Sequence, residues 1–144
     1  MTEQEIRTIL NRQREYFATG ATLSRKFRAE QLGKLKASLQ RHEEELNAAL
    51  QQDLGKSRME SYMCEIGLTL SELTWMQKHL RGLMQEKRVP TPLSQFAAIS
   101  FRSPSPYGTV LIMSPWNYPV LLTLDPLIDA IAAGNTAVVK PSAY

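Results

Sequence analysis

The fold is decided by residues 109–142, which read TVLIMSPWNYPVLLTLDPLIDAIAAGNTAVVKPS. Residues 109–113 and 136–140 are short β-branched and apolar runs, typical of strands buried on both faces. Between them, residues 120–133 carry apolar side chains at helical spacing, and the Gly-Asn pair that follows favours a helix end. Pro126 lies inside this stretch, so we expect a kink or one lost backbone hydrogen bond there. The order strand, helix, strand predicts a βαβ unit with two parallel strands.

The loops that follow the two strands hold the candidate binding residues. In an open parallel sheet, ligands bind beyond the carboxyl ends of the strands, where loops meet helix N-termini. The first loop is residues 114–119, and the second strand ends at Lys140, before Pro141 and Ser142. We therefore expect a site in which backbone groups, the Asn117 amide and the Lys140 ammonium meet a ligand.

Residues upstream of this unit have a different composition. The chain has 144 residues, with 17 Lys and Arg, 14 Asp and Glu, and a formal charge of +3. Of these 31 charged residues 27 precede residue 91, whereas all eight prolines lie at position 90 or later. Because acidic and basic residues are interleaved in the first part, we expect solvated helix surfaces there and no nucleic-acid partner.

Three amphipathic helices are predicted before residue 90. Residues 2–17 begin with a capping box formed by Thr2 and Glu5, and residues 24–52 and 57–87 each carry one apolar stripe. Such stripes need a covering layer, for which the sheet is the candidate. We therefore predict an α/β fold in which long N-terminal helices pack on the start of a parallel, Rossmann-like dinucleotide-binding sheet, here an incomplete domain.

A short segment joins the two parts. Residues 88–95 are typical of a linker, and residues 96–102 alternate loosely as in a strand. The predicted organisation is an N-terminal helical layer at residues 1–90, a linker with an oligomerisation-type strand at 91–108, and the first βαβ unit of a truncated nucleotide-binding domain at 109–144.

Composition excludes several classes of protein. One cysteine cannot form an internal disulfide, and one cysteine with two histidines cannot supply a typical zinc site, so no metal is expected. The longest uncharged stretch, residues 103–124, contains four prolines and is not expected to span a membrane. The acidic, polar N-terminus lacks the features of a secretory signal, so we expect a cytoplasmic location.

Three stretches together resemble the aldehyde dehydrogenase superfamily: SPWNYP at 114–119, AIAAGNT at 130–136 and VKPS at 139–142. Shorter segments resemble its class 3 branch, which acts on fatty and aromatic aldehydes: DLGK at 53–56, EIG at 65–67, RVPTP at 88–92 and PYG at 106–108. The resemblance covers nearly the whole chain but only about the first third of a family member.

The resemblance implies NAD- or NADP-dependent oxidation of an aldehyde to a carboxylic acid, through a thiohemiacetal on a cysteine. In this scheme Asn117 is the catalytic residue of the chain, because it matches the asparagine whose amide helps to form the oxyanion hole. Lys140 matches the residue that hydrogen-bonds the adenosine ribose. The cofactor-binding residues that the resemblance implies are Met113, Ser114, Pro115, Trp116, Lys140 and Ser142.

Two departures from the family pattern carry consequences. Family members often have Glu after Lys-Pro-Ser, where its carboxylate crowds or repels a 2′-phosphate; this chain has Ala143, so we expect NADP to be tolerated or preferred. The family's nucleophilic cysteine and base glutamate lie downstream of this segment, and Cys64 does not match the nucleophile motif. We expect Cys64 to be a small helix residue and the 144-residue chain to be inactive alone.

Several residues also have a structural interpretation. Without the resemblance, Asn117 is typical of a turn and Lys140 of a surface charge at a strand end. Trp116 is equally compatible with a hydrophobic plug beneath its loop. His42 and His79 are expected to be half-buried packing residues.

Two classes of function follow from these alternatives. The favoured one is the N-terminal part of an NAD(P)-dependent aldehyde dehydrogenase with an aldehyde substrate. The other is a non-catalytic helical interaction module with an appended βαβ unit. For the complete enzyme we predict a homodimer through residues 96–102, because a family strand near here joins an arm that pairs with another subunit, and an unpaired edge strand invites pairing.

Overall fold

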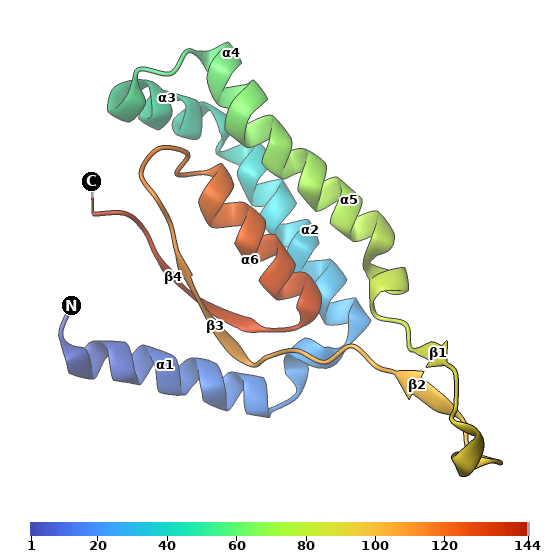
Figure 1. Cartoon of the computed structure of the whole chain (residues 1–144). Helices are drawn as coiled ribbons and strands as arrows, with labels where there is room; N and C mark the ends of the chain where they lie inside the picture. Colours follow the sequence, from blue (N-terminus) through green and yellow to red (C-terminus); the bar gives the residue numbers. More distant parts are fainter. Residues whose placement is uncertain (144) are drawn as a thin grey trace.

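The predicted strand–helix–strand unit is present in the computed structural model, which describes residues 1–143 (Figure 1). Strand β3 (Thr109–Met113), helix α6 (Leu121–Ala133) and strand β4 (Thr136–Lys140) follow one another along the chain. The two strands are parallel, and each residue of β3 pairs with the residue at the same place in β4. Tyr144, the last residue of the predicted unit, lies outside the described residues.

The turn between α6 and β4 determines where the strands align. Gly134 ends α6 in a left-handed conformation with φ of 89°. The Gly108 N–H donates to Asn135 Oδ1 at 2.9 Å, and the Gly108 carbonyl accepts from the Thr136 N–H at 2.9 Å. Pro126 has no N–H to donate, yet α6 is continuous across it. The consequence of this proline is therefore one missing backbone hydrogen bond without an interruption of the helix.

Helix α1 (Glu3–Ala18) has the predicted capping box. The Thr2 N–H donates to Glu5 Oε2 at 2.6 Å, and the Glu5 N–H donates to the Thr2 hydroxyl at 3.3 Å. The helix contacts β3 and β4, and the Thr136 hydroxyl donates to the Gln13 carbonyl at 3.3 Å. A short 3₁₀ turn, η1 (Ala21–Leu23), leads from α1 into the next helix.

The prediction of a single helix at residues 24–52 is wrong, because the structure has two helices there. Helix α2 (Arg25–Arg41) ends at His42, and α3 (Glu43–Leu54) begins directly after it. His42 has φ −101° and ψ 16°, and its ring Nδ1 lies 2.8 Å from the Ser38 carbonyl oxygen. A run of three glutamates then starts α3, where negative charge favours a helix N-terminus. Apolar spacing alone does not reveal this break.

The third predicted helix is interrupted by a π-helical turn. It comprises α4 (Arg58–Ser61), the π turn η2 (Tyr62–Ile66) and α5 (Gly67–Leu83). The Gly67 N–H donates to the Tyr62 carbonyl, five residues earlier. A Cβ at Gly67 would lie 2.7 Å from that carbonyl oxygen, so the turn requires glycine. The helix ends at Leu83, before the predicted end at residue 87.

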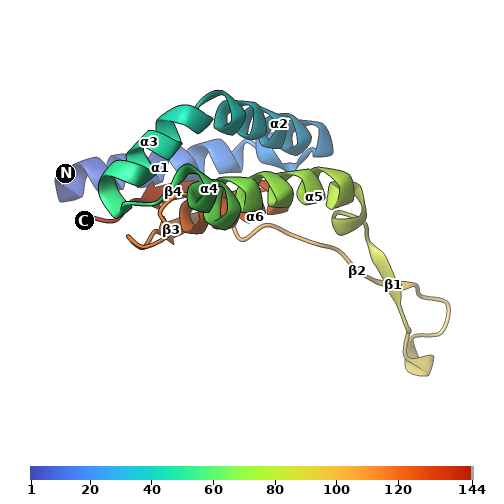
Figure 2. The same cartoon turned by 90° about the horizontal axis from the view of Figure 1, so that it is seen from above.

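A hairpin arm projects from the body of the molecule (Figures 1 and 2). Strand β1 (Lys87–Val89) and strand β2 (Ser100–Arg102) pair antiparallel, with the 3₁₀ turn η3 (Leu93–Gln95) between them. Of the strand predicted at residues 96–102, only the last three residues form a strand, since the chain turns at Ala97, where φ is 76°. The expectation of an unpaired strand is also wrong, because part of the predicted linker pairs with it.

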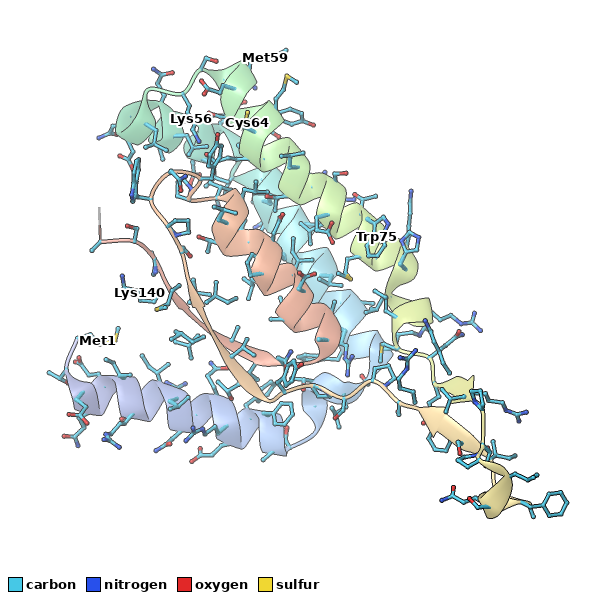
Figure 3. All side chains as sticks on the ribbon, viewed as in Figure 1. Met1, Lys56, Met59, Cys64, Trp75 and Lys140 are labelled. Atoms are coloured by element: carbon cyan, nitrogen blue, oxygen red, sulfur yellow. The ribbon has the colours of Figure 1, made fainter. Side chains whose placement is uncertain are left out.

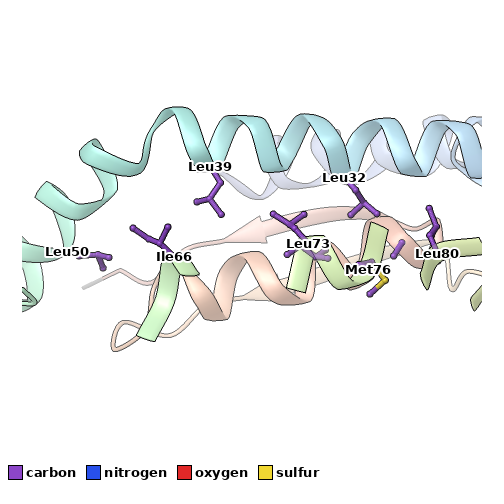
Figure 4. Close-up of a cluster of buried hydrophobic side chains, with 9 residues drawn as sticks. Leu32, Leu39, Leu50, Ile66, Leu73, Met76 and Leu80 are labelled. Carbon is purple, nitrogen blue, oxygen red and sulfur yellow. The ribbon is translucent and has the colours of Figure 1, made fainter. Parts of the chain in front are cut away.

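The main apolar core lies between α2 and α3 on one side and α5 and α6 on the other (Figure 4). Leu32, Ile66, Leu73 and Ile128 are fully buried. The whole cluster consists of Leu32, Leu39, Leu50, Ile66, Leu73, Met76, Leu80, Ile128 and Ala132. The apolar stripes of the second and third predicted helices thus meet one another and α6, so α6 covers them and the expectation that the sheet does so is wrong.

The sheet is less covered than the sequence predicts. Leu111 is 63% and Met113 72% exposed, so β3 is not buried on both faces. Leu111 and Met113 lie two residues apart and therefore point to the same face of the sheet, whereas Ile112 between them is buried on the other face. None of the helices in the described part of the chain combines the length and the apolar character needed to cross a membrane.

Candidate active-site loops

The two candidate loops start side by side, as the sequence predicts. Met113 and Lys140 are partners in the parallel pairing of β3 and β4. The Ser114 N–H then donates to the Lys140 carbonyl oxygen at 3.1 Å, which extends the pairing by one bond. The loop that carries Asn117 and the segment that carries Ser142 therefore leave the sheet at the same edge.

Asn117 is exposed in the loop between β3 and α6. Its backbone carbonyl accepts a hydrogen bond from Lys56 Nζ at 3.0 Å. Within residues 1–143, the side-chain amide of Asn117 has no hydrogen-bond partner, so its N–H groups are available to a ligand. A tethered backbone with a free amide donor can stabilise negative charge on a ligand oxygen.

The candidate cofactor-binding residues combine apolar surface with two polar groups. Met113 and Trp116 are 72% and 58% exposed, and Lys140 is exposed at the end of β4. The exposure of Trp116 argues against a hydrophobic plug. Ser114 is buried, and its hydroxyl oxygen has no hydrogen-bond partner in the described part of the chain. This set suits a ligand with a flat apolar part and hydroxyl groups; Pro115 and Ser142 beside it are half-buried.

Sequence reasoning gave no role to a buried ion pair behind this loop. Lys56 Nζ donates to Glu65 Oε1 at 2.5 Å, and the two side chains are 9% and 0% exposed. The same ammonium lies 4.0 Å from the centre of the Tyr118 ring. Figure 3 shows Lys56 at the turn that joins β3 to α6. Helical-layer residues thus contact the loop of the candidate site.

Glu65 also caps helix α6. Its Oε2 accepts from the Val120 N–H at 2.8 Å and from the Leu121 N–H at 3.3 Å. These are among the amides that lack a partner within a helix. Glu65 lies in the EIG segment, which resembled the family's class 3 branch. Nothing in the spacing of that segment indicated that Glu65 contacts the start of α6, 55 residues farther along the chain.

The other end of α6 is held by a second buried cation. Arg28 donates from Nη1 to the Ala132 carbonyl at 3.0 Å and from Nε to the Thr22 carbonyl at 2.9 Å. Burial lowers the pKa of this guanidinium. A Cβ at Gly134 would overlap Arg28 Nη2, so the guanidinium lies directly against the turn before β4.

The remaining candidate residues lie outside this site. Cys64 is partly buried in the π turn. His42 is half-buried, as expected; it lies at the helix break, which was not expected. His79 is exposed instead of half-buried and stacks on Trp75 with ring centres 4.2 Å apart. Figure 3 shows Trp75 on α5, away from the loop.

The sequence matches known proteins along most of its length. The model of the aldehyde dehydrogenase family matches residues 1–144. The chain is 46% identical over 127 residues to the 4,4'-diaponeurosporen-aldehyde dehydrogenase of Staphylococcus aureus, which covers 88% of this chain and 28% of that protein. It is 45% identical over 133 residues to human aldehyde dehydrogenase family 3 member B1, which covers 92% of this chain and 28% of that protein.

Solved structures agree with these matches. The substrate-bound structure of Staphylococcus aureus AldH is similar with a TM-score of 0.93 and 44% identity, over 95% of this chain and 30% of that one. Aldehyde dehydrogenase 21 from Physcomitrella patens has a TM-score of 0.86 at 22% identity, over 99% of this chain and 30% of that one, which shows the fold. This chain spans 28% of the length of the two curated relatives. It belongs to the aldehyde dehydrogenase family, and its relatives include members of family 3.

Proposed function

We propose that this chain is the N-terminal part of an NAD(P)-dependent aldehyde dehydrogenase that oxidises aldehydes to carboxylic acids. Asn117 donates its side-chain amide N–H to the aldehyde oxygen as negative charge develops there. The attacking cysteine thiolate and the glutamate base come from residues beyond Tyr144. The 144-residue chain therefore has no activity alone.

The observation that carries this proposal is the free amide of Asn117 on a tethered loop. A neutral donor that is fixed before the reaction stabilises an oxyanion without reorganising in the transition state. The Lys56 contact fixes the backbone at Asn117, while the exposed side chain keeps its donors available.

The residues at the strand ends fit a nicotinamide dinucleotide. This cofactor supplies the hydride acceptor of the reaction when it is bound. The Lys140 ammonium donates to ribose hydroxyls, and Ser142 lies on the segment that follows it. Met113, Ser114, Pro115 and Trp116 line the cofactor from the other loop; the Ser114 hydroxyl itself is buried and has no hydrogen-bond partner in the described part of the chain.

Ala143 extends the proposal to the choice of cofactor. A methyl side chain at this position has no charge to repel a 2′-phosphate, so NADP is accepted. We expect Ala143→Glu to lower kcat/KM with NADP by about tenfold while that with NAD changes little, from one added like charge. A strong NAD preference in the unmodified enzyme that Ala143→Glu leaves unchanged contradicts this part.

The hairpin arm supports a homodimer as the complete protein's assembly. Leu93, Phe96 and Ile99 are 89%, 88% and 65% exposed at its tip. Burying such side chains between two subunits is favourable, and the outer edges of a two-stranded ribbon are free to pair. Light scattering of the complete protein should give twice the mass of one chain; a monomer at working concentration contradicts the proposal. The proposed location is the cytoplasm.

The function is tested on the complete gene product, meaning residues 1–144 with whatever the reading frame encodes beyond them. It should reduce NAD or NADP when an aliphatic or aromatic aldehyde is added. Asn117→Ala should lower kcat about 100- to 1,000-fold, as expected for loss of one oxyanion donor. Asn11→Ala, at an exposed position on α1, is the matched control. A product that turns over no aldehyde contradicts the proposal.

A further inference from the structure

The segment from Asn117 to Leu121 is tied at both ends to one ion pair in the helical layer. Lys56 Nζ holds the Asn117 carbonyl at 3.0 Å, and Glu65 Oε2 holds the Val120 and Leu121 N–H groups at 2.8 and 3.3 Å. We propose that Lys56 and Glu65 are positioning residues that set where the Asn117 amide lies. This inference rests on the proposed function, since it assigns a role to the residues behind the oxyanion donor.

The Lys56 ammonium is surrounded by three partners. They are the Glu65 carboxylate at 2.5 Å, the Asn117 carbonyl at 3.0 Å and the face of the Tyr118 ring at 4.0 Å. A cation in such a cage has little freedom, because movement toward one partner weakens another. Two consecutive loop residues are therefore held by one side chain.

The Glu65 carboxylate divides its oxygens between the two elements. Oε1 accepts from Lys56, and Oε2 accepts from the start of α6. Negative charge at a helix N-terminus is favourable, since the first amides lack partners within the helix. Loop and helix thus share one anchor, so their relative position is determined by a single carboxylate that is fully buried.

A role in stability alone does not explain this choice of residues. A buried ion pair often stabilises a fold no better than apolar side chains of similar volume, because both charges lose their hydration. An apolar pair cannot donate to the Asn117 carbonyl or accept from the α6 amides. The carboxylate also lies in a π turn, a feature that is frequent at functional sites, and Gly67 is required for that turn.

The inference predicts a specific kinetic signature. Without the tether the Asn117 amide is misplaced, which acts on the transition state and leaves ground-state binding unchanged. We expect Lys56→Met in the complete gene product to lower kcat about 10- to 100-fold with little change in the KM of aldehyde or cofactor. Lys34→Met, which breaks an exposed ion pair with Glu30 at 2.8 Å, is the matched control and should leave kcat unchanged.

A double-mutant cycle distinguishes positioning from a general structural effect. If Lys56 acts through Asn117, then Lys56→Met should change kcat by less than about twofold in the Asn117→Ala background. The same loss in both backgrounds, or no loss in either, overturns the inference while leaving the proposed function intact. If Asn117→Ala alone leaves kcat unchanged, the proposed function fails and the inference fails with it.

Two further measurements keep the inference testable if the Lys56→Met variant does not fold. Lys56→Met combined with Glu65→Leu leaves no unpaired charge at this site, so it should fold, yet kcat should stay about tenfold or more below the original. Recovery of kcat overturns the inference. Independently of activity, amide exchange at Val120 and Leu121 in this double variant should be at least about tenfold faster, because the caps are lost. Unchanged exchange there also overturns it.

Discussion

Helix α6 and the hairpin arm place apolar residues in opposite surroundings. Helix α6 is capped by Glu65 at its start and by Arg28 at its end, and its Ile128 is fully buried. The arm exposes 88% of Phe96 at its tip, away from the body. The helix is specified by contacts within residues 1–143, whereas the arm presents a surface that only another surface can cover. If the complete protein is the proposed homodimer, its folding and its assembly depend on different segments of this chain.

The largest expected effect is a loss of unfolding free energy for a substitution in the core that a substitution in the arm does not cause. Leu73→Ala removes a fully buried side chain of α5 and should lower the free energy of unfolding by about 2–5 kcal/mol. Phe96→Ala in the arm should change it by less than about 0.5 kcal/mol. Denaturant unfolding of the two variants measures both values. Similar losses would mean that the arm packs against the body in solution, which contradicts the contrast drawn here.

The second effect concerns the C-terminal end of α6. Arg28→Met keeps much of the side-chain volume but removes the hydrogen bonds to the Thr22 and Ala132 carbonyls, which are then buried without a partner. We expect a loss of about 1–3 kcal/mol in the free energy of unfolding. Lys34→Met, at an exposed ion pair, should lose less than about 0.5 kcal/mol. Equal losses of unfolding free energy in the two variants would show that Arg28 does not stabilise the end of α6.

The smallest expected effect is a dependence of folding stability on pH that arises from Asp125 on α6. Burial raises the pKa of Asp125 above its ordinary value of 3.8, with further contributions from Glu72 and Asp129. As pH rises above 3.8 the unfolded chain loses this proton before the folded chain does, so folding stability falls until the raised pKa is passed. Asp125→Asn should therefore gain stability relative to the original protein at neutral pH, by less than about 1 kcal/mol.

Chemical denaturation at acidic and at neutral pH measures this difference. Glu86→Gln, at an exposed position, is the matched control and should show no such trend. A stability difference between Asp125→Asn and the original protein that does not grow with pH would show that the Asp125 carboxyl is ionised at no cost.

Local sequence patterns predicted the elements whose determinants are local. The capping box at Thr2 and Glu5, the Gly134 helix end and the parallel pairing of β3 with β4 were all predicted correctly. The break at His42 and the π turn were not, because the apolar stripe continues through both. Periodicity records which side chains face the core and is insensitive to one residue of altered backbone.

The candidate site shows the same division. The sequence predicted that the Asn117 loop and the end of β4 leave the sheet together, since parallel strands bring their carboxyl ends to one edge. It did not predict the Lys56–Glu65 pair, whose partners lie 55 to 61 residues away. Contacts of this kind arise only when separate elements pack, so no local pattern encodes them. The roles of Asn117 and Lys140 themselves stay predictions.

The central claim is that the Asn117 amide donates to the aldehyde oxygen, and Asn117→Asp in the complete gene product tests it most directly. Aspartate has nearly the same shape and keeps the carbonyl that Lys56 holds, but it replaces the donor with an acceptor. The account predicts that kcat falls about 100- to 1,000-fold while the melting temperature is unchanged. Full turnover by this folded variant would contradict it.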